Sequence, residues 1–152
     1  MKLKLPRKIR EKILHALRLA GDREIGGILM GEQIGPSEFR IVDLSIDDVS
    51  GSAAHFVRSV DQHQQALAAF FDRTSNDYAR HNYLGEWHSH PRYATRPSAE
   101  DLDSMNGLVD GERDISFAVL LIVRRRFWRG LEAASYVFGR DAGPAHAHLE
   151  FE

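Results

Sequence analysis

One run of the chain limits the possible folds more than any other. The segment "ISFAVLLIV", Ile115 to Val123, is almost continuously apolar. It is far shorter than the ~20 residues that a membrane-spanning helix needs. A short apolar run of this kind is typical of a central strand that is buried on both faces. Such a strand needs a covering layer on each side, so the run predicts a β-sheet with helices packed against it.

Shorter patterns predict the other elements of the fold. Helical spacing of apolar residues predicts three helices, over residues 6–20, 61–78 and 98–111. Apolar and β-branched runs predict four more strands, over residues 24–34, 38–46, 82–90 and 131–139. Gly35-Pro36-Ser37 is a turn between the first two strands, and Gly26-Gly27 indicates a close approach of two backbones. Six basic residues from Lys2 to Lys12 are assigned to a solvated face of the first helix.

These elements alternate along the chain without repeats or linkers. At 152 residues, with 43% hydrophobic and 28% charged residues, the chain is long and apolar enough for one compact core. We therefore expect residues 1–152 to form a single α/β (α+β) domain, with a mixed central sheet flanked by helices.

Composition excludes several classes of function. A net charge of −2 provides no general attraction to nucleic acid or to anionic membranes, so we expect neither as a partner. The absence of cysteine excludes disulfides, thiolate metal sites and cysteine nucleophiles. Since no stretch resembles a signal peptide, a cytoplasmic location is expected.

The segment "GEWHSHPRYATRPSAED", Gly85 to Asp101, concentrates groups that can bind a metal. In an extended strand His88 and His90 project from one face, so their imidazoles can share one ion. A catalytic zinc ion usually has three protein ligands and a water molecule. Asp101 is the predicted third ligand, because the loop over residues 91–97 can fold the next helix back over the strand end. Such a site lowers the pKa of bound water to about 7 and needs no side-chain nucleophile.

Simpler interpretations exist for each part of this pattern. An H-x-H pair alone is weak, and the chain contains a second one, His146 and His148, without a following serine and acid. Ser98 and Asp101 also form a capping box by residue type, which stabilises a helix by ~1 kcal/mol without any catalysis. The conjunction of H-x-H-P with S-x-x-D favours a metal site.

Hydrolysis at such a site also requires a general base. Two glutamates are candidates: Glu24, just before the Gly26-Gly27 strand, and Glu86, on the same strand face as the histidines. The pattern alone does not decide between them.

The chain resembles the JAMM metalloproteases, also called the MPN or Mov34 family. Their motif is an upstream glutamate followed by H-x-H-P and S-x-x-D, which matches Glu24, "HSHP" at His88 to Pro91 and "SAED" at Ser98 to Asp101. The resemblance implies one Zn²⁺ held by His88, His90 and Asp101, with Glu24 as the general base. It also implies that Ser98 binds the oxyanion of the tetrahedral intermediate.

The resemblance extends to the substrate. Members of the family cleave isopeptide or peptide bonds after the C-terminal glycine of ubiquitin or ubiquitin-like proteins, whose tail lies beside the site as an added strand. Glu86-Trp87 before the histidines is more similar to the stand-alone bacterial members. This implies a deconjugase that acts with E1-like and E2-like enzymes of antiphage defence operons. The alternatives are a peptidase that processes a sulfur-carrier protein, an MPN scaffold without catalysis, and DNA-repair-associated relatives, against which the near-neutral charge counts.

Overall fold

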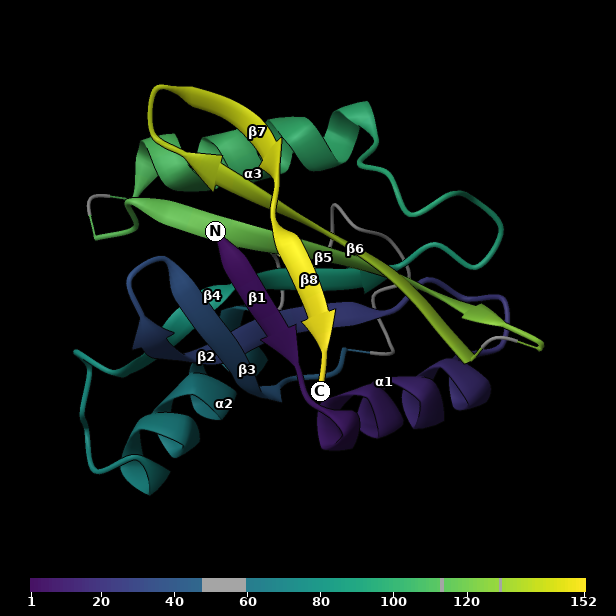
Figure 1. The fold of residues 1–152 in the computed structure, drawn as a ribbon, viewed down its shortest axis with the longest axis horizontal. Helices are drawn as coiled ribbons and strands as arrows, with labels where there is room; N and C mark the ends of the chain where they lie inside the picture. Colours follow the sequence, from purple (N-terminus) through teal and green to yellow (C-terminus); the bar gives the residue numbers. More distant parts are fainter. Residues whose placement is uncertain (48–59, 113, 129) are drawn as a thin grey trace.

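A computed structural model describes residues 1–47, 60–112, 114–128 and 130–152 of the chain. In this part of the protein, three helices accompany eight strands (Figure 1). The helices are α1 (Arg7–Ala20), α2 (Val60–Arg73) and α3 (Ala99–Gly111). The strands are β1 (Lys2–Leu5), β2 (Gly26–Gly35), β3 (Glu38–Leu44), β4 (His81–Ser89), β5 (Phe117–Arg126), β6 (Gly130–Gly139), β7 (Ala142–His146) and β8 (His148–Phe151).

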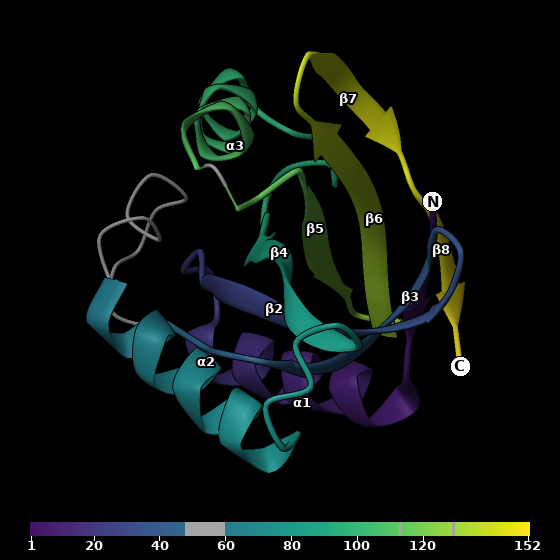
Figure 2. The same cartoon turned by 90° about the vertical axis from the view of Figure 1, so that its left-hand side faces the viewer.

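The strands form one mixed sheet in the order β7-β6-β5-β4-β2-β3-β1-β8. β4 is parallel to β5, and β1 is parallel to both β3 and β8, whereas the other pairs are antiparallel. The two outermost strands, β7 and β8, are consecutive in the chain. The sheet therefore curves strongly until its two edges meet, as Figure 2 shows.

The helices cover both faces of the sheet, as the apolar run of β5 predicts. Val119, Leu121 and Val123 pack into the core cluster that contains the buried side of α1. The alternate residues of the same strand, Ala118 and Leu120 among them, pack against the buried side of α3. α2 covers β2 on the same side of the sheet as α3. Ile28 packs beneath α2 and pairs with Glu86, which in turn pairs with Leu120 beneath α3, and paired residues point to the same side of a sheet. The prediction of a central strand that is buried on both faces is confirmed.

α1 also matches its prediction, beginning after Pro6 and ending before Gly21, with Ile9, Ile13 and Leu17 buried. The second predicted helix is too long by five residues. α2 ends at Arg73, and the chain then turns through Ser75 and Asn76, which have φ values of 56°. None of the helices in the described ranges is both long and apolar enough to cross a membrane.

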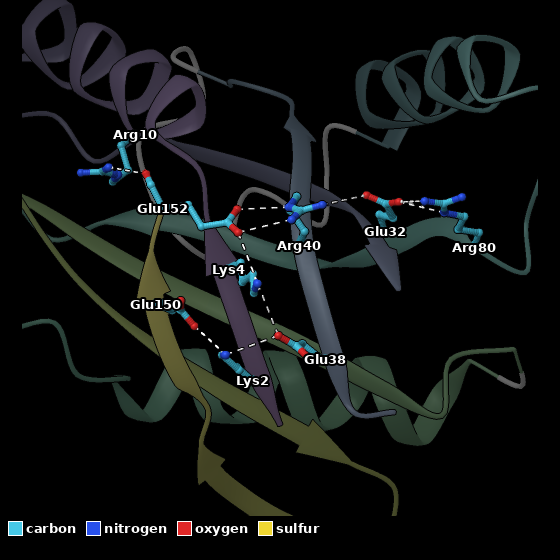
Figure 3. A network of polar contacts seen from close by, with 9 residues as sticks. All are labelled: Lys2, Lys4, Arg10, Glu32, Glu38, Arg40, Arg80, Glu150 and Glu152. Atoms are coloured by element: carbon cyan, nitrogen blue, oxygen red, sulfur yellow. Dashed lines mark hydrogen bonds and ion pairs between the residues drawn. The ribbon is translucent and has the colours of Figure 1, made fainter. Parts of the chain in front are cut away.

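The assignment of Lys2 and Lys4 to the first helix is wrong. Both lie on β1, where Leu3 and Leu5 point into the core and the lysines point outward. Lys2 pairs with Glu150 at 2.7 Å and Lys4 with Glu152 at 3.4 Å, both on the far side of the β1–β8 junction (Figure 3). A strand of four residues carries too little periodicity to be detected, and here its formation depends on partners far along the chain. β7 and β8, of five and four residues, were not predicted because they are equally short.

The predicted backbone approach at the glycine pair is confirmed. A Cβ atom on Gly27 would lie 2.3 Å from the carbonyl oxygen of Ser45, so β2 can pass this segment only without a side chain there. Beside it, Gly26 pairs with His88 of β4. The glycine pair therefore lies between the segment of Ser45 and the strand that carries the histidines.

Candidate metal centre

A β-bulge in β4 determines where the histidine side chains point. Leu29 of β2 pairs with Gly85, but Met30 pairs with Tyr83, so Leu84 is the extra residue. After a bulge, each side chain of the strand points to the opposite face of the sheet from the one it would otherwise face. Gly85 has a φ of 148°, and a Cβ atom there would lie 1.9 Å from the carbonyl oxygen of Val119. Only glycine fits at this position.

Beyond the bulge, Trp87 and Ser89 point to the α1 side of the sheet and are fully buried. Glu86 and His88 point to the opposite side, toward α3. His90 is the first residue after β4, and its N–H donates to the carbonyl of Val123 at 2.9 Å. The strand end is therefore fixed to β5 immediately beside the second histidine.

The structure brings the three predicted ligands, His88, His90 and Asp101, together. His88 Nε2 lies 2.9 Å from His90 Nε2 and 3.5 Å from Asp101 Oδ2, and the His90 nitrogen lies 3.7 Å from the same oxygen. All three residues are buried, and each offers one ligand atom within 4.8 Å of the others. Two ring nitrogens so close to each other and to a carboxylate are favourable only with a proton or a cation between them. The donor set, two imidazoles and one carboxylate, suits a divalent metal.

A backbone carbonyl sets the orientation of His90. Its Nδ1 lies 2.9 Å from the carbonyl oxygen of Ala94. A carbonyl can only accept, so Nδ1 must carry the proton and donate it. In the neutral ring this leaves the Nε2 lone pair facing the group of ligands, the arrangement that metal-binding histidines usually show.

The loop that supplies this carbonyl is tied to the neighbouring strands. Arg124 of β5 donates to the carbonyl of Tyr93 at 3.0 Å, and the hydroxyl of Tyr136 on β6 donates to that of Thr95 at 3.0 Å. Sequence reasoning missed these ties and the Ala94 carbonyl. No sequence signal could have found them, because any residue type provides a backbone carbonyl.

Asp101 combines the two interpretations that its sequence pattern allows. It completes the capping box of α3: its N–H donates to Ser98 Oγ at 3.1 Å, and its Oδ2 accepts the N–H of Ser98 at 2.7 Å. The same carboxylate faces both histidines. Burial alone would raise the pKa of Asp101, but the interactions with His88 and the hydrogen bonds with Ser98 lower it to about 2. The cap therefore holds the carboxylate of Asp101 where its Oδ2 faces both histidines.

The two glutamates considered as general base occupy different places. Glu24 is half-buried and precedes β2, and the pairing of Gly26 with His88 places it opposite His90 in the extended register. Glu86 lines a small pocket beside His88 and Asp101, where burial raises its pKa, with a smaller contribution in the same direction from the charge of Asp101. The structure thus places the Glu86 carboxylate beside His88 and Asp101, and the backbone of Glu24 at the other end of the same stretch, just before β2.

The second H-x-H pair has no such surroundings. His146 and His148 are both exposed, and the His146 ring lies tilted against Tyr136, with 4.6 Å between the ring centroids. Within the described ranges, His88, His90 and Asp101 form the one group of three or more potential metal ligands.

Fold and site together define a JAB/MPN domain. Residues 6–144 match the family Prok-JAB, the prokaryotic homologs of the JAB domain, and the chain therefore belongs to this family. The predicted family resemblance and the mixed α+β fold are confirmed.

Two curated bacterial relatives are both named CD-NTase/cGAS isopeptidase. One, from Vibrio cholerae, is 32% identical over 114 residues, and the other, from Escherichia coli, is 33% identical over 110 residues. Each match covers 70% of this chain but 66% of the relative, so the chain spans just under two thirds of the length of these relatives.

Two solved structures share the fold. A Desulfitobacterium hafniense protein has a TM-score of 0.68 at 24% identity, over 99% of this chain and 92% of its own. A JAB1/MPN domain protein from Archaeoglobus fulgidus has a TM-score of 0.50 at 17% identity, over 98% of both chains. At these identities the likeness shows the fold alone.

Proposed function

We propose that this protein is a zinc-dependent isopeptidase that cleaves the bond after the C-terminal glycine of a conjugated protein. The observation that carries the proposal is the buried group of His88, His90 and Asp101 at the centre of a Prok-JAB fold. The isopeptidase names of the two bacterial relatives support the reaction class.

His88, His90 and Asp101 would hold the metal. When bound, zinc acts as a Lewis acid that polarises a carbonyl group and makes water acidic enough to attack it near neutral pH. The hydrogen bond from His90 Nδ1 to Ala94 and the low pKa of Asp101 support this assignment, because the first turns Nε2 toward the group of ligands and the second favours the charged carboxylate.

Glu24 would accept a proton from the attacking water and pass it to the departing amine, while the C–N bond breaks and a C–O bond forms. Its place opposite His90 supports this role. The Ser98 hydroxyl would donate to the oxyanion. Since its oxygen already accepts from the N–H of Asp101 and its side chain is exposed, its proton can point toward a substrate.

For the substrate, we propose a conjugate whose acyl side is a ubiquitin-like protein or another protein with a C-terminal glycine. The names of the relatives support a CD-NTase as one partner in such conjugates. The proposal places the protein in the bacterial cytoplasm, beside E1-like and E2-like enzymes of an antiphage system.

The test uses a quenched branched peptide, in which a peptide ending in Gly-Gly is joined by its carboxyl group to the ε-amino group of a lysine. We expect purified protein to contain about one zinc per chain and to cleave this reporter until a chelator removes the metal. Glu24→Gln should retain the zinc and lose cleavage by roughly 10²- to 10⁴-fold.

Glu86→Gln is the matched control, since it removes a neighbouring carboxylate and should retain most of the activity. Equal losses in the two variants would remove Glu24 from its role. A linear reporter joined to the α-amino group tests isopeptide selectivity and separates deconjugation from the processing of a linear precursor. Protein without zinc and without turnover would be a scaffold.

A further inference from the structure

Ser89, between the two histidines, makes an unusual contact with the segment that carries Glu24. It is fully buried and points to the opposite side of the sheet from His88. Its N–H donates to the carbonyl of Ile25 at 2.8 Å, and its Oγ accepts the N–H of Ile25 at 3.0 Å. In a regular antiparallel ladder a backbone carbonyl would accept this N–H. Here a side-chain hydroxyl takes its place.

This contact lies one residue from Glu24. On the other side of the glutamate, the N–H of Arg23 donates to the carbonyl of Ala20 at the end of α1, at 3.2 Å. Glu24 therefore lies between a hydrogen bond to the end of α1 and the hydrogen bonds with Ser89, and it is not itself part of a strand. Beyond Ile25, Gly26 bonds to Asp47 on the other neighbouring segment. Ser89 thus fixes Ile25 to the strand that carries the histidines.

We propose that Ser89 is a positioning residue: its buried hydroxyl holds the Ile25 amide and thereby sets Glu24 beside His90. The inference rests on the proposed function, in which Glu24 is the general base. Ser89 binds neither the metal nor the substrate. An alanine would leave the Ile25 N–H without its acceptor in a buried place, and the strand end would have to shift to find another. A shift of about 1 Å at a catalytic group can lower a rate by 10²-fold.

The activity test compares three variants on the branched reporter. Ser89→Ala should lower kcat by roughly 10- to 100-fold and leave KM and zinc content unchanged. Ser89→Thr keeps the hydroxyl and should restore most of kcat. Ser135→Ala is the matched control: Ser135 is another buried serine, whose Oγ donates to the carbonyl of Ala147 at 3.1 Å, and its loss should leave kcat unchanged.

Two further measurements distinguish positioning from a general loss of stability. If Ser89 acts through Glu24, Ser89→Ala should add little to the loss in a Glu24→Gln background. In zinc-free protein, Ser89→Ala should accelerate hydrogen exchange of the Ile25 amide, and Ser135→Ala should not. The second measurement needs no turnover.

An unchanged kcat in Ser89→Ala, additive losses in the double variant, or unchanged exchange at Ile25 would each overturn the inference. Loss of zinc from Ser89→Ala would also overturn it, because the serine would then act through the histidines. These results leave the proposed function intact. A zinc-loaded wild-type protein that cleaves no reporter would instead end the proposed function, and this inference with it.

Discussion

The two H-x-H pairs of this chain have the same spacing and different surroundings. In both, the residue between the histidines is buried, Ser89 in the first pair and Ala147 in the second. The histidine side of β4 is covered by α3, which places Asp101 over the rings. His146 and His148 lie at the junction of β7 and β8 and face solvent. The comparison teaches that side-chain alternation along a strand puts two imidazoles on one side of the sheet. Whether they can form a metal site then depends on whether a helix with a further ligand covers that side.

The position of each pair in the sheet explains this difference. β4 lies between β2 and β5, so both of its sides are paired and its histidines lie in the interior. β7 and β8 are the edge strands. Burial of two imidazoles is costly without partners, which makes the first pair dependent on Asp101 or a metal. The second pair carries no such cost.

The largest expected effect follows from removing a ligand from the first pair. His88→Ala should lower zinc content from about one per chain to near zero and abolish cleavage of the branched reporter, because two ligands rarely retain zinc. His146→Ala should change neither. Metal analysis and reporter assays measure both. Retained zinc and activity in His88→Ala would show that the site lies elsewhere.

A second prediction compares the strands that carry the two pairs. Gly85→Ala in β4 must place a Cβ atom against the backbone of Val119 at an unfavourable φ, so the free energy of unfolding should fall by roughly 2 to 6 kcal/mol. Gly143 lies in β7, where an added Cβ would meet no atom within 4 Å. Gly143→Ala should therefore be nearly neutral. Denaturant unfolding checks both, and equal losses would contradict the bulge as the source of the cost.

A third prediction concerns the serine that follows only the first pair. Ser98→Ala should lower the free energy of unfolding by ~1 kcal/mol through loss of the helix cap and should lower kcat by roughly 10²-fold through loss of the oxyanion donor. Ser98→Asp keeps a good cap but has no hydroxyl. It should regain the stability and not the activity. Recovery of kcat in Ser98→Asp would mean that Ser98 serves only the helix.

The smallest expected effect concerns the charge of Asp101, the carboxylate that faces the first histidine pair and has no counterpart at the second among the described residues. The pKa of Asp101 is lowered to about 2, so in metal-free protein its contribution to stability is present above pH ~4 and is lost as the pH falls toward 2. We expect it to be on the order of 1 kcal/mol, as for a single hydrogen-bonded charge. Unfolding followed from pH 5 to 2 should show this decrease, and Asp101→Asn should flatten it. A variant with the same slope as the wild type would show that Asp101 is not charged in the empty site.

Prediction from the sequence succeeded where the pattern is local. The apolar run of β5, the helical spacing of α1 and the Ser98 to Asp101 capping box are all readable within about a dozen residues. β1, β7 and β8 were missed because each consists of only four or five residues, and β1 and β8 also pair with strands far away in the chain. Lys2 and Lys4 were consequently assigned to the wrong element.

The chain by itself determined which side chains can take part in the proposed chemistry. Alternation along an extended segment places His88 and His90 on one side, and the serine-to-aspartate spacing starts a helix, whatever the rest of the protein does. Tertiary structure decided that α3 sits over that side, that the Ala94 carbonyl orients His90, and that Ser89 ties Ile25 to the histidine strand. Whether the residues of these contacts meet depends on the order of the strands in the sheet and on the bulge in β4, where a glycine packs against β5. Spacing in a sequence fixes local direction, whereas distance between remote segments is set by how the whole core packs.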